Sequence, residues 1–133
     1  MSQNRKNIFT ISCGIFFTAI SFNITIGNAW ASKGFSRTCK DIQINGAVLT
    51  ASCKRHDGTF KATRINLNPY IGNFNGRLKW DGQDFIQTCY DISLSGNSIL
   101  SAKCRTKAQV HITSFIDLED SISNIDGNLR FHP

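Results

Sequence analysis

The sequence lacks the motifs of the common enzyme and metal chemistries. It contains no Cys-x-x-Cys pair, no Gly-x-Ser-x-Gly turn and no glycine-rich phosphate loop. The histidines His56, His111 and His132 lie at no spacing typical of zinc ligands. The carboxylates that could pair for glycoside hydrolysis fit better as solvated loop and turn residues; they are Asp81, Asp84, Asp117, Glu119, Asp120 and Asp126. We therefore expect no enzyme, no metal site and no cofactor.

A sustained helical pattern is also missing. Four short segments alternate apolar and polar residues, which is typical of half-buried strands; they are residues 42–44, 77–80, 92–94 and 128–131. Gly46, Gly96 and the pairs at 75–76 and 126–127 mark turns between strands. Single helical turns are expected only around 68–70 and 119–121. The pattern predicts an all-β fold of short antiparallel strands.

Charge is absent from the stretch between Asn7 and Ser32. Arg5 and Lys6 precede this stretch, and Ala29-Trp30-Ala31 ends it with small residues at the positions that a signal peptidase recognises. An uncleaved anchor fits less well, because Ser, Thr and Asn are scattered through the segment. We expect residues 1–31 to be a signal peptide, and the mature chain to be secreted or periplasmic without membrane insertion.

The predicted mature chain keeps 13 basic and 9 acidic residues, a net charge of +4. That charge is too small to indicate nucleic-acid binding by itself. It also keeps four cysteines, Cys39, Cys53, Cys89 and Cys104, an even number that predicts disulfides in an exported protein. Four cysteines allow three pairings, and an internal duplication favours one bridge within each copy.

That duplication is visible at a displacement of about 50 residues. Thr38-Cys39-Lys40-Asp41-Ile42 returns as Thr88-Cys89-Tyr90-Asp91-Ile92, and residues 73–76 return, after one insertion, as residues 124–127. The copies span roughly 32–82 and 83–133. Each copy is too short to bury a sizeable core alone, so we expect one domain over 32–133 with pseudo-twofold character.

Polar residues recur in three places: before the first cysteine of each copy, after its second cysteine, and at the Asn-x-(Asn/Asp)-Gly turns. Their amides, hydroxyls and cations suit sugar hydroxyls. Each cluster also has an ordinary structural explanation as a turn, a cysteine neighbour or surface charge. Binding is favoured only slightly by the residues alone.

The cysteine spacing and the turn motif, Asn-x-(Asn/Asp)-Gly-x-Leu-(Lys/Arg)-(Trp/Phe), resemble the cyanovirin-N family, and its founding cyanobacterial member in particular. The resemblance extends from Ser32 to His132. It implies a non-enzymatic lectin for high-mannose oligosaccharides with terminal α1,2-linked mannose. It also implies bridges Cys39–Cys53 and Cys89–Cys104, two lobes that exchange strands between the repeats, and one site in each lobe. Cross-linking of glycans through the two sites would make an antiviral effect a consequence of binding.

The resemblance also assigns the site residues. The mid-chain site would comprise Asn73, Asn75, Asp84, Gln87, Thr88, Arg105, Thr106, Lys107 and Gln109. The terminal site would comprise Lys33, Gly34, Arg37, Thr38, Lys54, Arg55, His56, Asn124, Ile125 and Asp126. In the terminal site, Gly34, Arg37, Lys54 and His56 depart from the founding member. The mid-chain site departs at Asn75, Asp84, Gln87 and Lys107, where hydrogen-bonding capacity largely survives although Lys107 replaces a planar arginine fork with a flexible point charge. We expect the mid-chain site to be the better one.

The segment between the repeats, Asp81-Gly82-Gln83-Asp84, has no proline to stiffen it. We expect a mainly monomeric protein with a chain-swapped dimer as its alternative form. Two other functions compete with the lectin: a disulfide-stabilised secreted inhibitor or structural module, and a basic nucleic-acid-binding β domain. The second would need an aromatic platform; Trp80 and Phe131, at equivalent repeat positions, fit core packing better.

Overall fold

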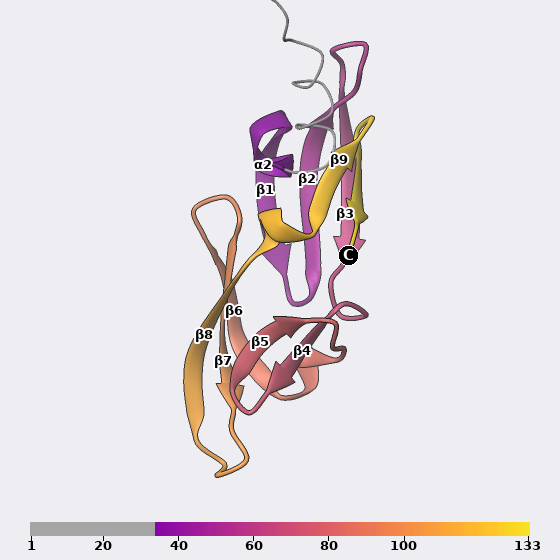
Figure 1. The fold of residues 1–133 in the computed structure, drawn as a ribbon. Helices are drawn as coiled ribbons and strands as arrows, with labels where there is room; N and C mark the ends of the chain where they lie inside the picture. Colours follow the sequence, from indigo (N-terminus) through magenta and orange to yellow (C-terminus); the bar gives the residue numbers. More distant parts are fainter. Residues whose placement is uncertain (1–33) are drawn as a thin grey trace, which may run out of the picture. The chain divides into compact units, whose positions relative to one another are not determined.

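The computed structural model describes residues 34–133. The predicted signal peptide, 1–31, and the site residue Lys33 lie outside these residues. The elements follow in the order α2 (Phe35–Thr38), β1 (Cys39–Asn45), β2 (Val48–Lys54), β3 (Phe60–Asn66), β4 (Ile71–Phe74), β5 (Arg77–Trp80), η3 (Phe85–Gln87), β6 (Cys89–Ser95), β7 (Ile99–Arg105), β8 (His111–Asp117), η4 (Leu118–Asp120), β9 (Ile122–Ile125) and β10 (Asn128–Phe131). Figure 1 shows the strands as arrows.

The strands form two three-stranded antiparallel sheets, β1-β2-β3 and β6-β7-β8, and two hairpins, β4-β5 and β9-β10. In each sheet the first strand bulges, between Lys40 and Gln43 and between Tyr90 and Ser93. Asp41 and Asp91 lie in these bulges with φ of 54° and 53°, a left-handed conformation that aspartate tolerates better than most residues. The repeated sequence thus gives a repeated sheet, down to its irregularity.

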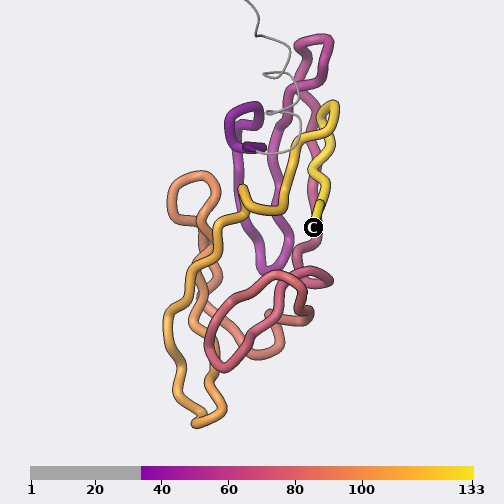
Figure 2. Tube along the Cα trace, viewed as in Figure 1, coloured from indigo at the N-terminus to yellow at the C-terminus, as the bar shows by residue number. Residues whose placement is uncertain are grey.

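Each hairpin packs on the sheet of the opposite repeat. β10, from the second repeat, packs against β3 of the first, and β5, from the first repeat, packs against β8 of the second. In Figure 1 and in the tube of Figure 2, the yellow β9–β10 hairpin lies beside the indigo-to-magenta β1–β3 sheet. Residues 34–66 with 121–133 form the terminal lobe, and residues 67–120 form the mid-chain lobe. The expected strand exchange is present.

Repeat-equivalent residues fill the core. Phe35 and Phe85 are each fully buried, as are Leu49 and its counterpart Leu100. Bridges join Cys39 to Cys53 and Cys89 to Cys104, the within-repeat pairing that the resemblance implies, and each pair lies directly opposite in its sheet. The bridges therefore tie the first two strands of each sheet at the end where the polar clusters lie.

The predicted elements agree with the structure in type. The four alternating segments lie in β1, β5, β6 and β10, and the expected turn at 119–121 is present as η4, displaced by one residue. The segment 68–70 is a turn and not a helix. Two single helical turns, α2 and η3, were not predicted, and they bring Phe35 and Phe85 into the core. Across residues 34–133, no helix has the length and apolar character needed to cross a membrane.

Candidate functional site: two matched polar turns

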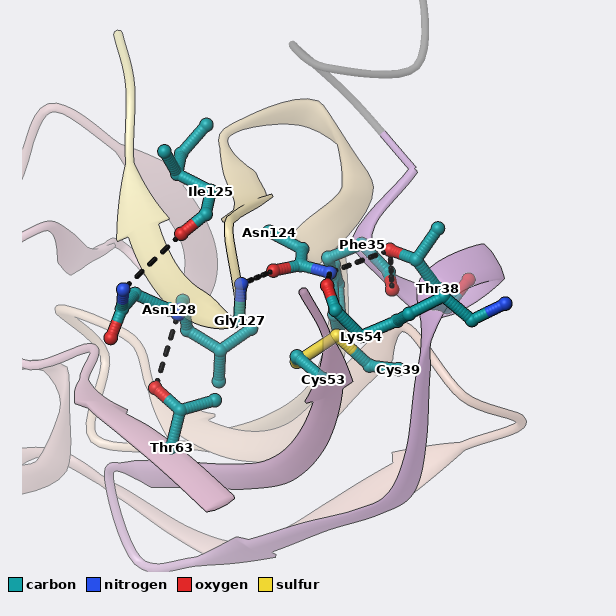
Figure 3. The surroundings of a disulfide bond; sticks show 12 residues. Phe35, Thr38, Cys39, Cys53, Lys54, Thr63, Asn124, Ile125, Gly127 and Asn128 are labelled. Atoms are coloured by element: carbon teal, nitrogen blue, oxygen red, sulfur yellow. Dashed lines mark hydrogen bonds between the residues drawn. A yellow bond between two sulfur atoms is a disulfide. The ribbon is translucent and has the colours of Figure 1, made fainter. Parts of the chain in front are cut away.

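In the terminal lobe, the β9–β10 turn is attached to the first sheet through Asn124. The Asn124 amide donates to Thr38 Oγ1 and to the carbonyl of Lys54, both at 2.9 Å, and its Oδ1 accepts the Gly127 N–H at 2.8 Å. Figure 3 shows this side chain reaching from the yellow hairpin to the disulfide-linked ends of β1 and β2. Asn124 is only 7% exposed. Its two amide donors and its acceptor are all used inside the protein.

The mid-chain lobe repeats this arrangement with Asn73. Its amide donates to Thr88 Oγ1 and to the Arg105 carbonyl, both at 2.9 Å, and its Oδ1 accepts the Gly76 N–H at 2.7 Å. Asn73 is half-buried, so this copy is more open to solvent than the Asn124 copy. In both predicted sites, the turn asparagine thus makes the same hydrogen bonds to the threonine before the first cysteine and to the carbonyl after the second cysteine.

A second contact in each lobe joins the turn to the loop after the second cysteine. Asp126 Oδ1 accepts the backbone N–H of His56, and Asn75 Oδ1 accepts the backbone N–H of Lys107, each at 2.9 Å. The His56 ring also lies 3.9 Å from the Asp126 carboxylate. Because the backbone makes these bonds, the side chains of His56 and Lys107 are left at the surface, where both are exposed.

The glycine of each turn lets the loop approach closely. Gly76 has φ of +91°, and a Cβ there would lie 2.7 Å from Ile112 and 2.8 Å from Thr106. Gly127 has φ of +87°, and a Cβ there would lie 2.9 Å from Arg55. The Asn-x-(Asn/Asp)-Gly motif therefore serves both the turn conformation and the contact between turn and loop.

The remaining site residues surround these turns. Arg37, Lys54, Arg55, Ile125, Arg105 and Gln109 are exposed, and Gly34 and Thr106 are half-buried. Thr106 Oγ1 accepts the Val110 N–H at 3.2 Å and so shapes its own loop. Gln109 takes φ of 67°, with its N–H donated to the Thr106 carbonyl. Among these remaining residues, the exposed side chains are cations and the apolar Ile125 in the terminal lobe, and the cation of Arg105 and the amide of Gln109 in the mid-chain lobe.

Two predicted mid-chain residues have contacts away from the Asn73 turn. The Asp84 carboxylate accepts the Asn68 amide at 3.1 Å, and the Asp84 N–H donates to the Asn68 carbonyl. Gln87, at the end of η3, donates its N–H to the Asp84 carbonyl. Asp84 adopts φ of 62° before η3. These hydrogen bonds hold the segment between the repeats and do not join Asp84 or Gln87 to Asn73.

Sequence reasoning missed the residues that fix these surroundings. Asn68 binds both Asp84 and the Ile86 N–H. Thr63 Oγ1 and Ser114 Oγ accept the N–H groups of Leu129 and Leu78, at 3.1 and 2.9 Å, and fix each hairpin to its sheet. Thr63 and Ser114 are equivalent at the displacement of 51, so the repeat alignment contains the signal for this second pair.

In the loop beside the terminal turn, hydrogen bonds lower the pKa of Asp57. The Thr59 hydroxyl and the Thr59 backbone N–H both donate to the Asp57 carboxylate. These bonds, the hydroxyl's more than the backbone's, hold the pKa of Asp57 below its ordinary value of 3.8. The Arg55 N–H donates to the Thr59 carbonyl at 2.7 Å. Asp57 therefore stays ionised near neutral pH and keeps the loop of Arg55 and His56 folded back.

Among the described residues, the two turns offer hydrogen-bonding groups, and we find no cluster of metal ligands and no free cysteine thiol beside them. Between residues 34 and 133, no three His, Cys, Asp or Glu side chains group as metal ligands. All four cysteines of this part of the chain are oxidised in the two bridges. What the turns can do is hold polar side chains at fixed positions on the surface of each lobe.

Comparison with known proteins agrees with this architecture. A family model for the CVNH domain matches residues 35–130. A cyanovirin-N homolog of Neurospora crassa is 27% identical over 106 residues, covering 72% of this chain and 96% of the relative. A cyanovirin-N homolog of Tuber borchii is 34% identical over 88 residues, covering 65% of this chain and 84% of the relative.

A solved structure of microvirin in complex with mannobiose superimposes with a TM-score of 0.66 at 31% sequence identity. The match covers 75% of this chain and 99% of microvirin. The matches cover 84% to 99% of each relative, so the relatives are about the length of the two lobes.

Proposed function

This chain belongs to the CVNH family of carbohydrate-binding lectins, and on that premise we propose that it binds high-mannose oligosaccharides through two sites, one in each lobe. The family is not enzymatic. The terminal α1,2-linked mannose disaccharide is the proposed recognition unit.

The observation that carries the proposal is the match between the two turns. Each lobe uses a turn asparagine, a threonine before the first cysteine and a carbonyl after the second cysteine to fix the same polar surface. A surface that was merely solvated would not need this network in both copies. Preorganised polar groups lower the entropy lost on binding a sugar.

Residues of the predicted sites divide into two roles. Asn73, Asn124, Thr38 and Thr88 use their polar atoms inside the protein, and we assign them to positioning. The exposed side chains that the turns hold in place would contact the sugar: Arg105, Lys107 and Gln109 in one lobe, and Arg37, Lys54, Arg55 and His56 in the other. Cations and amides can donate to sugar hydroxyl oxygens.

Mannobiose bound to microvirin supports a mannose ligand, because microvirin shares this fold at 31% identity. Two sites in one chain would let a dense glycan array be cross-linked, with avidity of about 10²–10⁴ over one site. Such cross-linking would underlie an antiviral effect on enveloped particles. It also requires export of the chain, which the charge-free segment before residue 33 favours.

An array of mannose-terminated, glucose-terminated and N-acetylglucosamine-terminated oligosaccharides tests the proposal. The protein should be expressed with residues 1–31 included and collected after export, so that the mature terminus can be read by mass spectrometry. We expect binding to glycans with terminal α1,2-linked mannose. Absence of binding to every oligosaccharide would contradict a lectin role and favour the secreted inhibitor or structural module.

The two sites are assigned with a matched pair, Lys107→Ala and His56→Ala. These residues are repeat equivalents whose backbone N–H bonds to the turns survive the change. We expect Lys107→Ala to weaken mannobiose binding more, since the mid-chain site keeps more of the expected polar residues. A larger loss from His56→Ala in titration calorimetry would reverse the ranking.

A further inference from the structure

The positive charge of the described chain is concentrated in one lobe. The terminal lobe has seven basic and three acidic residues, a net charge of +4, whereas the mid-chain lobe has five basic and six acidic residues, a net charge of −1. The two lobes therefore have similar folds but surfaces of different net charge. Such a difference attracts anions to one lobe and not to the other.

A shallow groove of about 740 Å³ lies on the β1-β2-β3 sheet of the positive lobe. It is lined mainly by groups that can hydrogen-bond to sugar hydroxyls and by two cations; these are Gln43, Thr50, Ser52, Thr63, Asn128, Lys61 and Arg64. One carboxylate, Asp41, and the two alanines Ala51 and Ala62 complete the lining. This groove contains none of the residues assigned to the mannose sites.

Strand register places one further cation, Lys40, on the same face as Arg64. One row across the three strands consists of Lys40, Ser52 and Ala62. The neighbouring row on the same face consists of Gln43, Thr50 and Arg64. Side chains opposite one another on neighbouring strands share a face of the sheet. Lys40 and Arg64 therefore flank the groove from the two outer strands, and both are exposed.

Three of the cations are held in place by contacts. Lys40 Nζ lies 4.2 Å, and Lys54 Nζ 5.9 Å, from the centre of the Phe60 ring, within the range of cation–π attraction. Lys61 Nζ donates to Asn128 Oδ1 at 2.5 Å, which links the edge strand β3 to the exchanged hairpin. Among residues 34–133, none of Lys40, Lys61 and Arg64 has a carboxylate within 4 Å of its charge.

The mid-chain lobe shows that this chemistry is not required by the fold. At the repeat positions of Lys40, Lys61 and Arg64 it has Tyr90, Ile112 and Phe115, and Phe115 is 61% exposed. Its Lys103 is paired with Asp91 at 3.5 Å. The cations of the terminal lobe are thus a property of one copy of the sheet.

We propose that the groove on the β1-β2-β3 sheet is a binding site for an acidic polysaccharide, one that carries sulfate or carboxylate groups. The cations would bind the acidic groups, and the hydroxyl and amide lining would bind the sugar hydroxyls between them. None of the residues that line the groove is aromatic, and the one exposed ring beside it, Phe60, is contacted by Lys40, so this lining favours a polysaccharide over a nucleic acid that needs several stacked bases. The lining of the groove shares no residue with the proposed mannose sites, and Phe60, which Lys40 and Lys54 both contact, connects it to the terminal site.

The test measures binding of dextran sulfate, polygalacturonate and uncharged dextran to the mature protein at 50 and 200 mM salt. The groove variant is Lys40→Gln/Lys61→Gln/Arg64→Gln, and its charge-matched control is Arg77→Gln/Lys79→Gln/Lys103→Gln in the mid-chain lobe. We expect the groove variant to lose about tenfold in affinity for one or both acidic polymers, from roughly two- to threefold per cation. The control should change affinity less than twofold.

Asp41→Asn gives a second readout, because removal of the groove carboxylate should raise the affinity for the acidic polymer about twofold. Asparagine tolerates the left-handed backbone at position 41. If the triple variant does not fold, the double change of the exposed Lys40 and Arg64 replaces it. Equal losses in the groove and control variants would overturn the proposal by showing general charge attraction.

If single-stranded DNA binds as tightly as either acidic polysaccharide, the proposed polysaccharide site is overturned and nucleic acid becomes the better ligand. Mannobiose binding is measured on every variant. Retained mannobiose affinity in the groove variant shows that a loss concerns the groove alone. Loss of mannobiose binding together with polymer binding would contradict the separation of the two sites.

Discussion

Asn124 and Asn73 show how one residue type can define a binding surface without being its outermost part. Each side chain makes three hydrogen bonds to its own protein, across the boundary between hairpin and sheet. The bonds leave the turn in one conformation and its neighbours exposed. The asparagines therefore contribute to stability first, and to recognition through the groups that they position.

Replacement of Asn124 by alanine should destabilise the fold by about 3 kcal/mol, since it leaves buried donors and acceptors unpaired. Asn73→Ala should cost less, about 2 kcal/mol, because Asn73 is half-buried and water can replace its partners. Urea unfolding followed by tryptophan fluorescence measures both. The control is Asn45→Ala, an exposed residue at the end of β1, which should change stability by less than about 0.5 kcal/mol. Equal costs at 73 and 124 would contradict the role of burial.

Asp57 allows a pH prediction at the same scale. Its pKa is lowered in the folded protein, so its hydrogen bonds to Thr59 stabilise the loop above the unfolded value of 3.8 and are lost as the pH falls through the folded value. Thr59→Val removes the hydroxyl donor and keeps the backbone donor. We expect the pKa of Asp57 to rise toward 3.8 in NMR titration, while Thr113→Val leaves it unchanged. An unaltered pKa in Thr59→Val would mean that the hydroxyl does not act on Asp57.

The sequence predicts which residues gather at each turn better than it predicts what their atoms do. The recurrence of Asn73 and Asn124, and of Thr88 and Thr38, marks the clusters correctly as repeated features. A repeated residue looks the same in sequence whether it faces a ligand or its own backbone. The inward orientation of Asn124 could be recognised only once the exchanged hairpin and Lys54 were placed together.

At the scale of elements, alternation and turn residues predict the strands because each sheet buries one face. The pattern is clear in β5, where Leu78 is buried between exposed neighbours. It fails for α2 and η3, which are single helical turns that bury Phe35 and Phe85 and are too short to show a helical period. Strand exchange came from the family resemblance, since nothing local to β9 or β10 states which sheet receives the hairpin.

The two bridges allow a quantitative test of the equivalence of the repeats. They close loops with sequence separations of 14 and 15, so each should stabilise the protein by about 3 kcal/mol through the lower entropy of the unfolded chain. The variants Cys39→Ala/Cys53→Ala and Cys89→Ala/Cys104→Ala should therefore lose similar stability in urea unfolding. Costs that differ by more than about 1.5 kcal/mol would show that the bridges also hold lobe-specific native contacts.

The whole molecule depends on how the chain passes from one repeat to the next. Residues 81–84 turn back so that Gly82 lies against Gly72 of β4, and Asp84 is fixed by Asn68. A Cβ on Gly82 would lie 2.7 Å from the Gly72 Cα and 2.8 Å from the Gly72 nitrogen, both backbone atoms that cannot move aside easily. The closed passage thus requires glycine for space.

Gly82→Ala should therefore shift the protein from the monomer that we propose toward a chain-swapped dimer. In the chain-swapped dimer, residues 81–84 would extend and residue 82 would no longer contact Gly72. The added methyl group therefore destabilises the monomer by about 2 kcal/mol and leaves the dimer unaffected. Sedimentation of samples refolded at high concentration measures the dimer fraction. The control Gly96→Ala alters a glycine with φ of +65° and nothing within 4 Å, so it should lose about 1 kcal/mol of stability and remain monomeric. A monomeric Gly82→Ala with unchanged stability would show that the Gly72 contact does not keep the passage closed.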